Sequence, residues 1–165
     1  MPAGVSLRPA READQPFLQR LFRSVRWDEL APTGWPDPVK VDFLASQFDL
    51  QQRHYRLAFA GADFDVIEHD GAAIGRLSVD RTTPDLHLVE IALAPEWRGR
   101  GVGGALLAQL QNEVRCGRGA RIVLNVERTN VDAQRLYQRL GFTESPPTSP
   151  YPGLSVEMVW PPPTE

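Results

Sequence analysis

Apolar residues recur at every third or fourth position in four stretches of the chain, and this spacing predicts four helices. Asp14 is the predicted N-cap of the first helix, and Asn130 is that of the fourth. The second helix, Val39–Arg53, follows a predicted loop that contains Pro and Gly, Trp27–Pro38. The residues that carry this pattern are, for the four helices in turn, Phe17, Leu18, Leu21, Phe22 and Val25; Val41, Phe43, Leu44, Phe48 and Tyr55; Val102, Leu106, Leu107, Leu110 and Val114; and Ala133, Leu136, Tyr137 and Leu140.

Between the helices the pattern changes to short alternating or β-branched runs, which predict strands. The predicted strands are Val5–Arg8, Phe64–Glu68, Ala73–Val79, Leu86–Leu93, Ile122–Val126, Phe142–Glu144 and Ser155–Trp160. Turn signals at Asp70-Gly71 and Thr83-Pro84-Asp85 join three of these strands into an antiparallel meander. The order of elements predicts an α/β fold, with a mixed central sheet of six to seven strands flanked by about four helices.

Length and charge narrow the protein class. A chain of 165 residues suits one domain, which we expect to span residues 1–165. The net charge of −3 gives no general attraction to nucleic acid or anionic membranes, and no apolar stretch approaches the length of a membrane span. The single cysteine, Cys116, can form no internal disulfide and has no partner for a metal site. We therefore expect a cytoplasmic protein without a metal, a nucleic-acid partner or a membrane partner.

The stretch PEWRGRGVGGALL, Pro95–Leu107, places glycines and arginines directly before an apolar helix. Backbone amides at a helix start have no partner within the helix and attract anions, and glycine lets a ligand come close to them. Arg98 and Arg100 can add charge-assisted contacts. The stretch therefore predicts a site for a ligand that carries phosphates.

Two other phosphate-binding motifs compete for this stretch. A P-loop is excluded because it needs lysine, and the only lysine is Lys40. Gly99, Gly101 and Gly104 fit a dinucleotide fingerprint, with Glu127 where a ribose-binding acid would follow. However, an antiparallel meander precedes the glycines, and roughly sixty residues after them are too few for the rest of that fold. An NAD(P)-dependent oxidoreductase remains the less favoured alternative.

Two motifs resemble those of the GNAT N-acetyltransferases. Arg98-x-x-Gly101-x-Gly103 is similar to the acetyl-CoA signature of that family, and it follows the strand end Ile91-Ala92-Leu93. NVDAQRLYQRLGF, from Asn130 to Phe142, resembles the family's second conserved segment. Together the motifs cover Leu86–Phe142, and they imply the GNAT (acyl-CoA N-acyltransferase) fold with acetyl-CoA as cofactor.

The resemblance implies a cofactor site. In this family the fourth and fifth strands splay apart, and the pantetheine arm lies between them. The implied contacts are backbone groups of Ile91, Ala92 and Leu93 for the arm, amides of Arg98, Gly99, Arg100, Gly101, Val102, Gly103 and Gly104 for the pyrophosphate, and Asn130 and Ala133 on the far side. A β-bulge near Ile91 would direct an N–H group at the thioester carbonyl.

The implied reaction is direct transfer of the acetyl group to an amine, which requires two proton transfers. Tyr137 matches the family's tyrosine that protonates the departing thiolate; as a residue among apolar neighbours, it could equally be a core tyrosine. Glu90 is the leading candidate for the base because a charged residue in an apolar strand needs a partner or a function. His87 is the competing candidate; strict alternation puts it on the opposite face, unless a bulge reverses the parity.

The acceptor is expected to be a small-molecule amine, or an amino group on a larger molecule, bound near the first two helices. Trp35, in the loop, is the better candidate for binding it, with Trp27 beside it, whereas Phe43, Phe48 and Tyr55 read as helix packing. Asn125 stands where some relatives carry an acid; it can hydrogen-bond the acceptor but cannot act as a base. An acyl-CoA-binding module without turnover remains an alternative, and a homodimer through the last strand and the proline-rich tail is compatible with the sequence.

Overall fold

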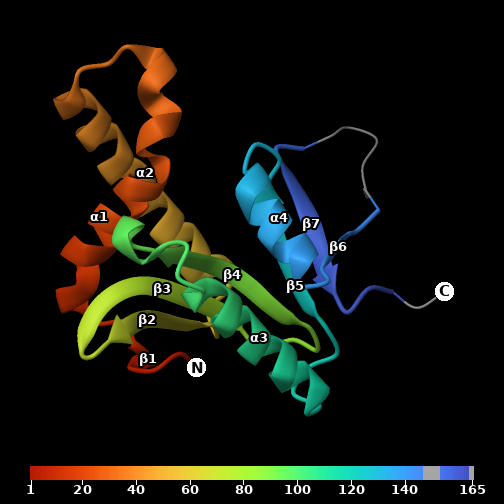
Figure 1. The fold of residues 1–165 in the computed structure, drawn as a ribbon. Helices are drawn as coiled ribbons and strands as arrows, with labels where there is room; N and C mark the ends of the chain where they lie inside the picture. The colour runs from red at the N-terminus through yellow and green to blue at the C-terminus, as the bar shows by residue number, and fades with distance from the viewer. Residues whose placement is uncertain (147–152, 164–165) are drawn as a thin grey trace.

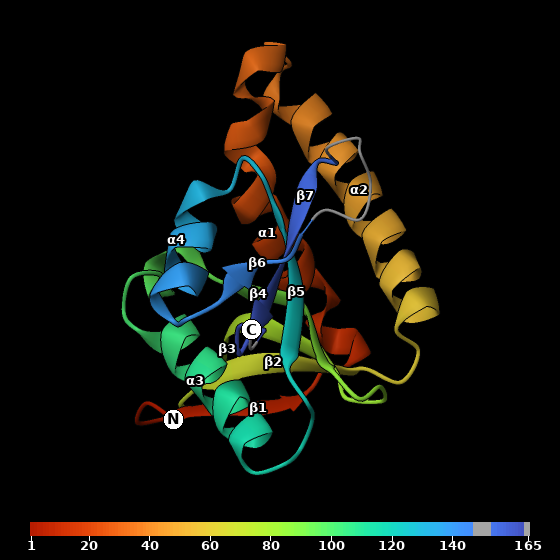
Figure 2. The ribbon, with the colours of Figure 1, turned by 90° about the vertical axis from the view of Figure 1, so that its right-hand side faces the viewer.

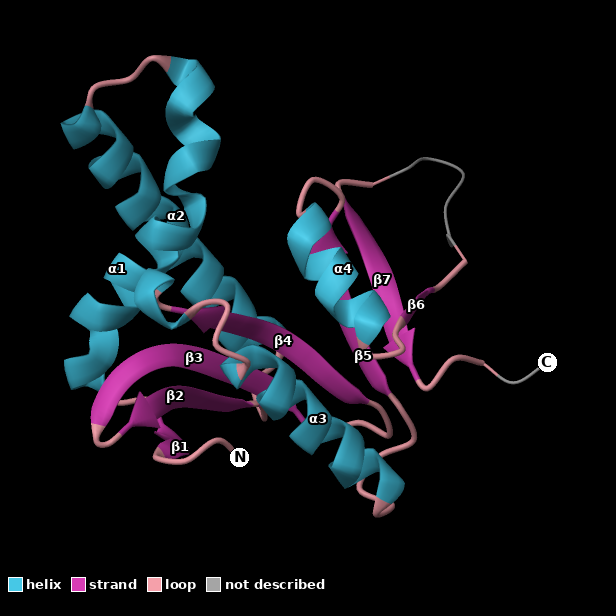
Figure 3. Ribbon diagram, viewed as in Figure 1, coloured by secondary structure: helices cyan, strands magenta, loops and turns pink. Residues whose placement is uncertain are grey.

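The computed structural model describes residues 1–146 and 153–163, which form a seven-stranded sheet in the order β1-β2-β3-β4-β5-β7-β6 and four α-helices (Figures 1 and 3). The strands are β1 Val5–Pro9, β2 Asp63–His69, β3 Ala72–Asp80, β4 Leu86–Leu93, β5 Ile122–Glu127, β6 Thr143–Glu144 and β7 Ser155–Trp160. The helices are α1 Gln15–Arg26, α2 Asp37–Ala58, α3 Val102–Arg115 and α4 Val131–Arg139. The predicted mixed sheet with about four helices is confirmed. The prolines that follow Ser145 in the sequence predict a loop there, and residues 147–152 of this stretch lie outside the described residues.

The sheet separates two apolar layers (Figure 2). On one face, α3 and α4 cover the larger core, in which Leu107 and Ile122 are fully buried. On the other face, α1 and α2 pack together through Phe22 and Phe48, whose ring centroids are 5.7 Å apart, over Val66 of β2. No helix in residues 1–146 or 153–163 combines the length and the apolar character that a membrane crossing requires.

α2 is longer than the predicted Val39–Arg53. It begins at Asp37, because proline is tolerated in the first turn of a helix. The N–H that Pro38 lacks would have no partner within the helix at this position. It continues to Ala58, since neither Gly nor Pro interrupts the chain after Arg53. The predicted loop before α2 is therefore shorter, and most of it is the 3-10 helix Trp27–Thr33.

Asp14 precedes α1 as predicted, but its side chain does not cap that helix. The carboxylate accepts hydrogen bonds of 2.8 and 2.7 Å from the Arg8 guanidinium and one of 2.7 Å from the Arg11 backbone N–H. The Arg8 contact is the main reason that the pKa of Asp14 falls to about 2. This pair ties β1 to the start of α1, and so fixes how α1 lies on the sheet.

β4 and β5 run parallel, but they pair only at their beginnings: Leu86 with Ile122, His87 with Val123 and Leu88 with Leu124. Beyond these pairs the two strands diverge, as Figure 1 shows. A β-bulge falls within the diverging part, where Ser78 pairs with Glu90 and Val79 pairs with Leu88, so that Val89 is the extra residue. The prediction of a bulge near Ile91, beside Glu90, is therefore confirmed, and the structure places it at Val89.

Candidate active site

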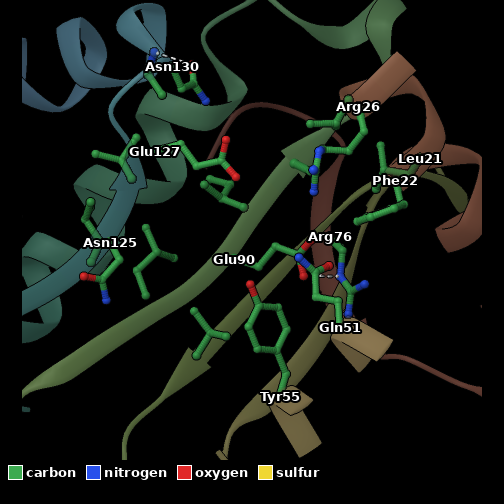
Figure 4. Close-up of a pocket in the computed structure, with 18 of the residues that line it drawn as sticks. Leu21, Phe22, Arg26, Gln51, Tyr55, Arg76, Glu90, Asn125, Glu127 and Asn130 are labelled. Atoms are coloured by element: carbon green, nitrogen blue, oxygen red, sulfur yellow. Dashed lines mark hydrogen bonds and ion pairs between the residues drawn. The ribbon is translucent and has the colours of Figure 1, made fainter. Parts of the chain in front are cut away.

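A cavity of about 500 Å³ opens where β4 and β5 diverge. One wall comes from the two strands and α4, and the other from α1 and α2 (Figure 4). The lining residues are Leu21, Phe22, Val25, Arg26, Glu29, Gln51, Tyr55, Arg76, Leu88, Val89, Glu90, Ile91, Ala92, Leu124, Asn125, Val126, Glu127, Thr129, Asn130, Ala133 and Tyr137. The cavity therefore joins the expected cofactor strand to the helices that were expected to bind the acceptor.

The glycine-rich loop leads from β4 to α3. Gly99 and Gly101 have φ values of 71° and 83°, which favour glycine, and Gly101 is the N-cap of α3. Arg98 holds the loop in place, since its Nε donates to the Leu93 carbonyl at 3.0 Å and its Nη2 to Ser24 Oγ at 3.2 Å. Arg100 lies 4.8 Å from the centre of the Trp97 ring.

The amides at the start of α3 are available to an anion. Those of residues 99–104 donate to no acceptor in the described part of the chain, but the Arg98 amide, which was expected among them, donates to the Pro95 carbonyl at 3.3 Å. A Cβ atom added at Gly103 would meet only Leu93 Cδ1, at 3.8 Å, and one at Gly104 would meet nothing within 4 Å. Glycine in a helix costs up to about 1 kcal/mol relative to alanine, and the protein's own packing does not require it here. This arrangement fits a diphosphate placed against the helix start.

The inner edge of β4 can accept an extended chain. Beyond Leu88, no described strand pairs with β4 on its β5 side, so the backbone groups of residues 89–92 that face away from β3 are free to bind a ligand, whereas the Leu93 carbonyl, expected among them, accepts from Arg98 Nε. Ile91 and Ala92 line the cavity there, while Asn130 and Ala133 line the wall opposite. The Asn130 side chain accepts from the Ala133 N–H at 3.2 Å, which confirms the predicted cap of α4.

Tyr137 extends from α4 into the same cavity. It is 8% exposed, and burial raises the pKa of its hydroxyl to about 12, so the hydroxyl stays protonated near neutral pH. The ring packs against Phe142 at a centroid distance of 5.7 Å, which fixes its orientation. The hydroxyl makes no hydrogen bond with any described residue, so its proton is available to a ligand in the cavity.

Glu90 lines the cavity from β4. Its side chain is 17% exposed, and burial raises its pKa, although the Arg76 guanidinium opposes that rise. Arg76 Nε lies 3.4 Å from Glu90 Oε2, and the Tyr55 hydroxyl points toward the same carboxylate (Figure 4). Burial, and then the charge of Glu90, raise the pKa of Tyr55. A carboxylate with a raised pKa next to a buried cation is suited to accept a proton.

His87 lies outside the cavity. The bulge at Val89 puts it on the same face as Glu90, because their partners Asp80 and Ser78 are two residues apart in β3. However, it sits where β4 and β5 are still paired, and its ring lies 4.8 Å from that of Phe59. Burial lowers its pKa despite the charge of Asp80. The structure therefore does not bring His87 together with Glu90 and Tyr137.

The two tryptophans expected to bind the acceptor also lie away from the cavity. Trp27 packs on the α1–α2 core under Lys40, whose Nζ is 5.2 Å from the ring centroid, and Trp35 packs edge-on against Phe43 at 5.3 Å. Asn125 does line the cavity.

The sequence analysis missed several residues that line the cavity. Tyr55, read as packing, faces the site, together with Gln51 and Arg26 (Figure 4). Glu127, considered only as a ribose-binding acid, lines the β5 side. Arg76 was not considered, although a charged residue within the apolar run Ile74–Val79 is the same kind of signal that identified Glu90.

Comparisons with known proteins agree with this geometry. The family model described as the acetyltransferase (GNAT) family matches residues 22–142. An uncharacterised N-acetyltransferase of Methanocaldococcus jannaschii is 35% identical over 85 residues, which cover 49% of this chain and 53% of that protein. The chain thus spans about half the length of this curated relative.

Two solved structures share the fold. The PaiA N-acetyltransferase of Thermoplasma acidophilum, in complex with coenzyme A, superposes with a TM-score of 0.66 at 16% identity, over 94% of this chain and 97% of that one. An acetyltransferase of Thermus thermophilus gives a TM-score of 0.66 at 20% identity, over 94% and 95%. Because the family model spans most of the chain, from α1 through α4, the chain belongs to the GNAT acetyltransferase family.

Proposed function

We propose that this protein transfers the acetyl group of acetyl-CoA directly to a primary amine of a small-molecule acceptor. The main observation behind the proposal is that a candidate base and a candidate acid line the same cavity, beside the unpaired edge of β4. Glu90 approaches from β4 and Tyr137 from α4. An oxidoreductase that binds NAD(P) needs neither this proton pair nor parted strands.

The cofactor site follows from the free backbone groups. Amides of residues 99–104 would hold the diphosphate of coenzyme A, and residues 89–92 of β4 would hold its extended arm. Bound acetyl-CoA supplies the acetyl thioester. Asn130 and Ala133 would line the site of the arm on the α4 side.

Two residues handle the protons of the transfer. An amine attacks only when neutral, so Glu90 takes the proton of the acceptor ammonium, directly or through a water molecule. The nearby Arg76 guanidinium favours the ionised form of Glu90, although burial raises the pKa of this carboxyl. Tyr137 Oη gives its proton to the departing sulfur, since burial keeps that hydroxyl protonated. These two roles favour turnover over a module that only binds acyl-CoA.

The acceptor would enter between α1, α2 and β5. Phe22 and Tyr55 offer apolar and aromatic surface there, and Asn125 and Glu127 offer polar groups on the opposite wall. The volume of about 500 Å³, shared with the acetyl end of the cofactor, suits a small molecule better than a folded protein chain.

Thiol release tests the proposal. The purified protein is mixed with acetyl-CoA and a panel of small primary amines, and free coenzyme A is measured with a thiol reagent. We expect release that depends on at least one amine, and an acetylated product by mass spectrometry. Acetyl-CoA should also raise the melting temperature, because a ligand that binds only the native state stabilises it. A shift with NAD(P) and none with acetyl-CoA would overturn the proposal.

A substitution at the helix start tests the cofactor site independently of turnover. Gly103→Val places a branched side chain beside Leu93, in the space proposed for the cofactor. We expect the Kd for acetyl-CoA to rise about tenfold or more, whereas the free energy of unfolding without ligand changes by less than about 1 kcal/mol. Gln109→Val, at an exposed position of α3, controls for the helix propensity of valine. Equal Kd values for the two variants would place the diphosphate elsewhere.

A further inference from the structure

A second cavity, of about 560 Å³, lies on the same face of the sheet as the active site but toward β2. It is bounded by the start of α1, the last turns of α2, and β2 and β3. Three arginines line it, Arg11, Arg56 and Arg76, against one carboxylate, Glu12. Arg76 also lines the active-site cavity, so this side chain is common to the two spaces.

The charges of the second cavity are not balanced by the protein. Within the described part of the chain, the Arg11 and Arg56 guanidinium groups form no ion pair and donate no hydrogen bond, in contrast to Arg8 and Arg81, which are paired with carboxylates. Even if Glu12 neutralised one arginine, the other would leave the cavity positive. The cavity therefore attracts anions.

A buried donor in the same cavity also lacks a partner. Gln52 Oε1 accepts from Arg76 Nη2 at 3.2 Å, which orients the amide and leaves Nε2 as the free end. Gln52 Nε2 is buried and has no hydrogen-bond partner among the described residues. An unsatisfied buried donor is costly, and an anionic oxygen would remove that cost.

We propose that this second cavity binds a compact oxyanion, a phosphate or a carboxylate. Arg11 and Arg56 hold it from the α1 and α2 sides, and the Gln52 amide donates to it from the floor. Arg76, whose side chain is only 5% exposed, forms the wall shared with the active site. The occupant is separate from the diphosphate of the cofactor, which lies at the start of α3.

The shared arginine couples the anion to the active site. Arg76 Nε lies 3.4 Å from Glu90 Oε2 but forms no hydrogen bond with it, so the contact is electrostatic and geometrically loose. An anion in the second cavity competes with Glu90 for the same guanidinium. This coupling is reciprocal. The bound anion weakens the Arg76–Glu90 contact, and removing the charge of Glu90 strengthens anion binding by the same free energy.

The site is tested by titrating inorganic phosphate and, separately, malonate at constant ionic strength, with melting temperature as the readout. The titrations are run with and without coenzyme A, so that binding at the start of α3 is recognised. We expect a saturable rise that persists with coenzyme A, and Arg56→Gln should weaken the binding about tenfold because a charge-assisted contact is lost. The matched control is Arg53→Gln, an exposed position of α2 that lines neither cavity, with binding unchanged within about twofold.

Each outcome of these titrations supports or contradicts the proposal. The site prefers whichever anion, phosphate or malonate, saturates the rise in melting temperature at the lower concentration. The proposed site is contradicted if neither anion gives a saturable rise in melting temperature. It is also contradicted if the Arg56→Gln and Arg53→Gln variants bind the anions equally well. Glu90→Gln should tighten anion binding severalfold, and unchanged or weaker binding would refute the coupling. None of these readouts requires acetyl transfer, so the proposed enzymatic function can fail without affecting them.

Discussion

Glu90→Gln lowers kcat for acetyl transfer by about 10²-fold or more at neutral pH. The variant keeps the shape of the side chain but can no longer take the proton of the acceptor amine. Because the pKa of Glu90 is raised above its usual range, the wild-type rate rises with pH as this carboxyl loses its proton, and it falls when the pH drops below that pKa. The measurement is kcat from thiol release across a pH series.

The deficit of Glu90→Gln should shrink as the pH approaches the pKa of the acceptor amine, since a neutral amine needs no base. Glu127→Gln is the matched control, because it removes a carboxylate from the opposite wall of the cavity; its effect should fall on KM for the acceptor.

His87→Gln should leave kcat within about twofold, because His87 lies outside the cavity. A wild-type kcat in the Glu90 variant, or a large loss with His87→Gln, would reassign the base. Melting temperatures, measured alongside, show whether Arg76 tolerates the loss of its partner.

Tyr137→Phe lowers kcat by about 10²-fold while the Kd for acetyl-CoA stays within about twofold. The substitution removes only the hydroxyl, so the ring keeps its packing against Phe142 and the melting temperature changes little. Because the pKa of Tyr137 is about 12, the hydroxyl remains an acid throughout the accessible range, and no alkaline decline of the wild-type rate should arise from it below about pH 11.

Tyr55→Phe controls for removing a tyrosine hydroxyl from this cavity. Tyr55 points toward Glu90 from the acceptor side, so its loss should alter KM for the amine more than kcat. If Tyr137→Phe and Tyr55→Phe have the same small effect on kcat, Tyr137 serves packing alone, and the departing sulfur takes its proton from water.

Features decided by neighbouring residues were predictable from the chain itself. The Asn130 cap is one example, since its side chain binds an amide three residues ahead. The helix start at the glycine-rich loop is another, because positive φ values at Gly99 and Gly101 restrict those positions largely to glycine. Both lie in the two motifs that first indicated the family, and the family model later matched the same part of the chain.

The acceptor side was harder to predict, because its residues meet only in three dimensions. Trp35 looked like a binding residue since it is large and lies in a loop, yet it packs against Phe43 away from the cavity. Tyr55 looked like packing because it extends an amphipathic helix, yet that helix runs further than predicted and brings Tyr55 to the site. One sequence does not distinguish an aromatic residue that packs in the core from one that lines a cavity, because either kind can stand on a helix or in a loop.

The sequence by itself determined the alternation of helices and strands, the glycine-rich helix start and the two candidates for proton transfer, because each rests on local backbone chemistry or on a charge in an apolar run. Only the tertiary structure decided where β4 and β5 part, which residue forms the bulge, and that Arg76 stands between Glu90 and a second cavity. Those features depend on the register between strands and on how α1 and α2 cross the sheet, which arise from many distant contacts acting together.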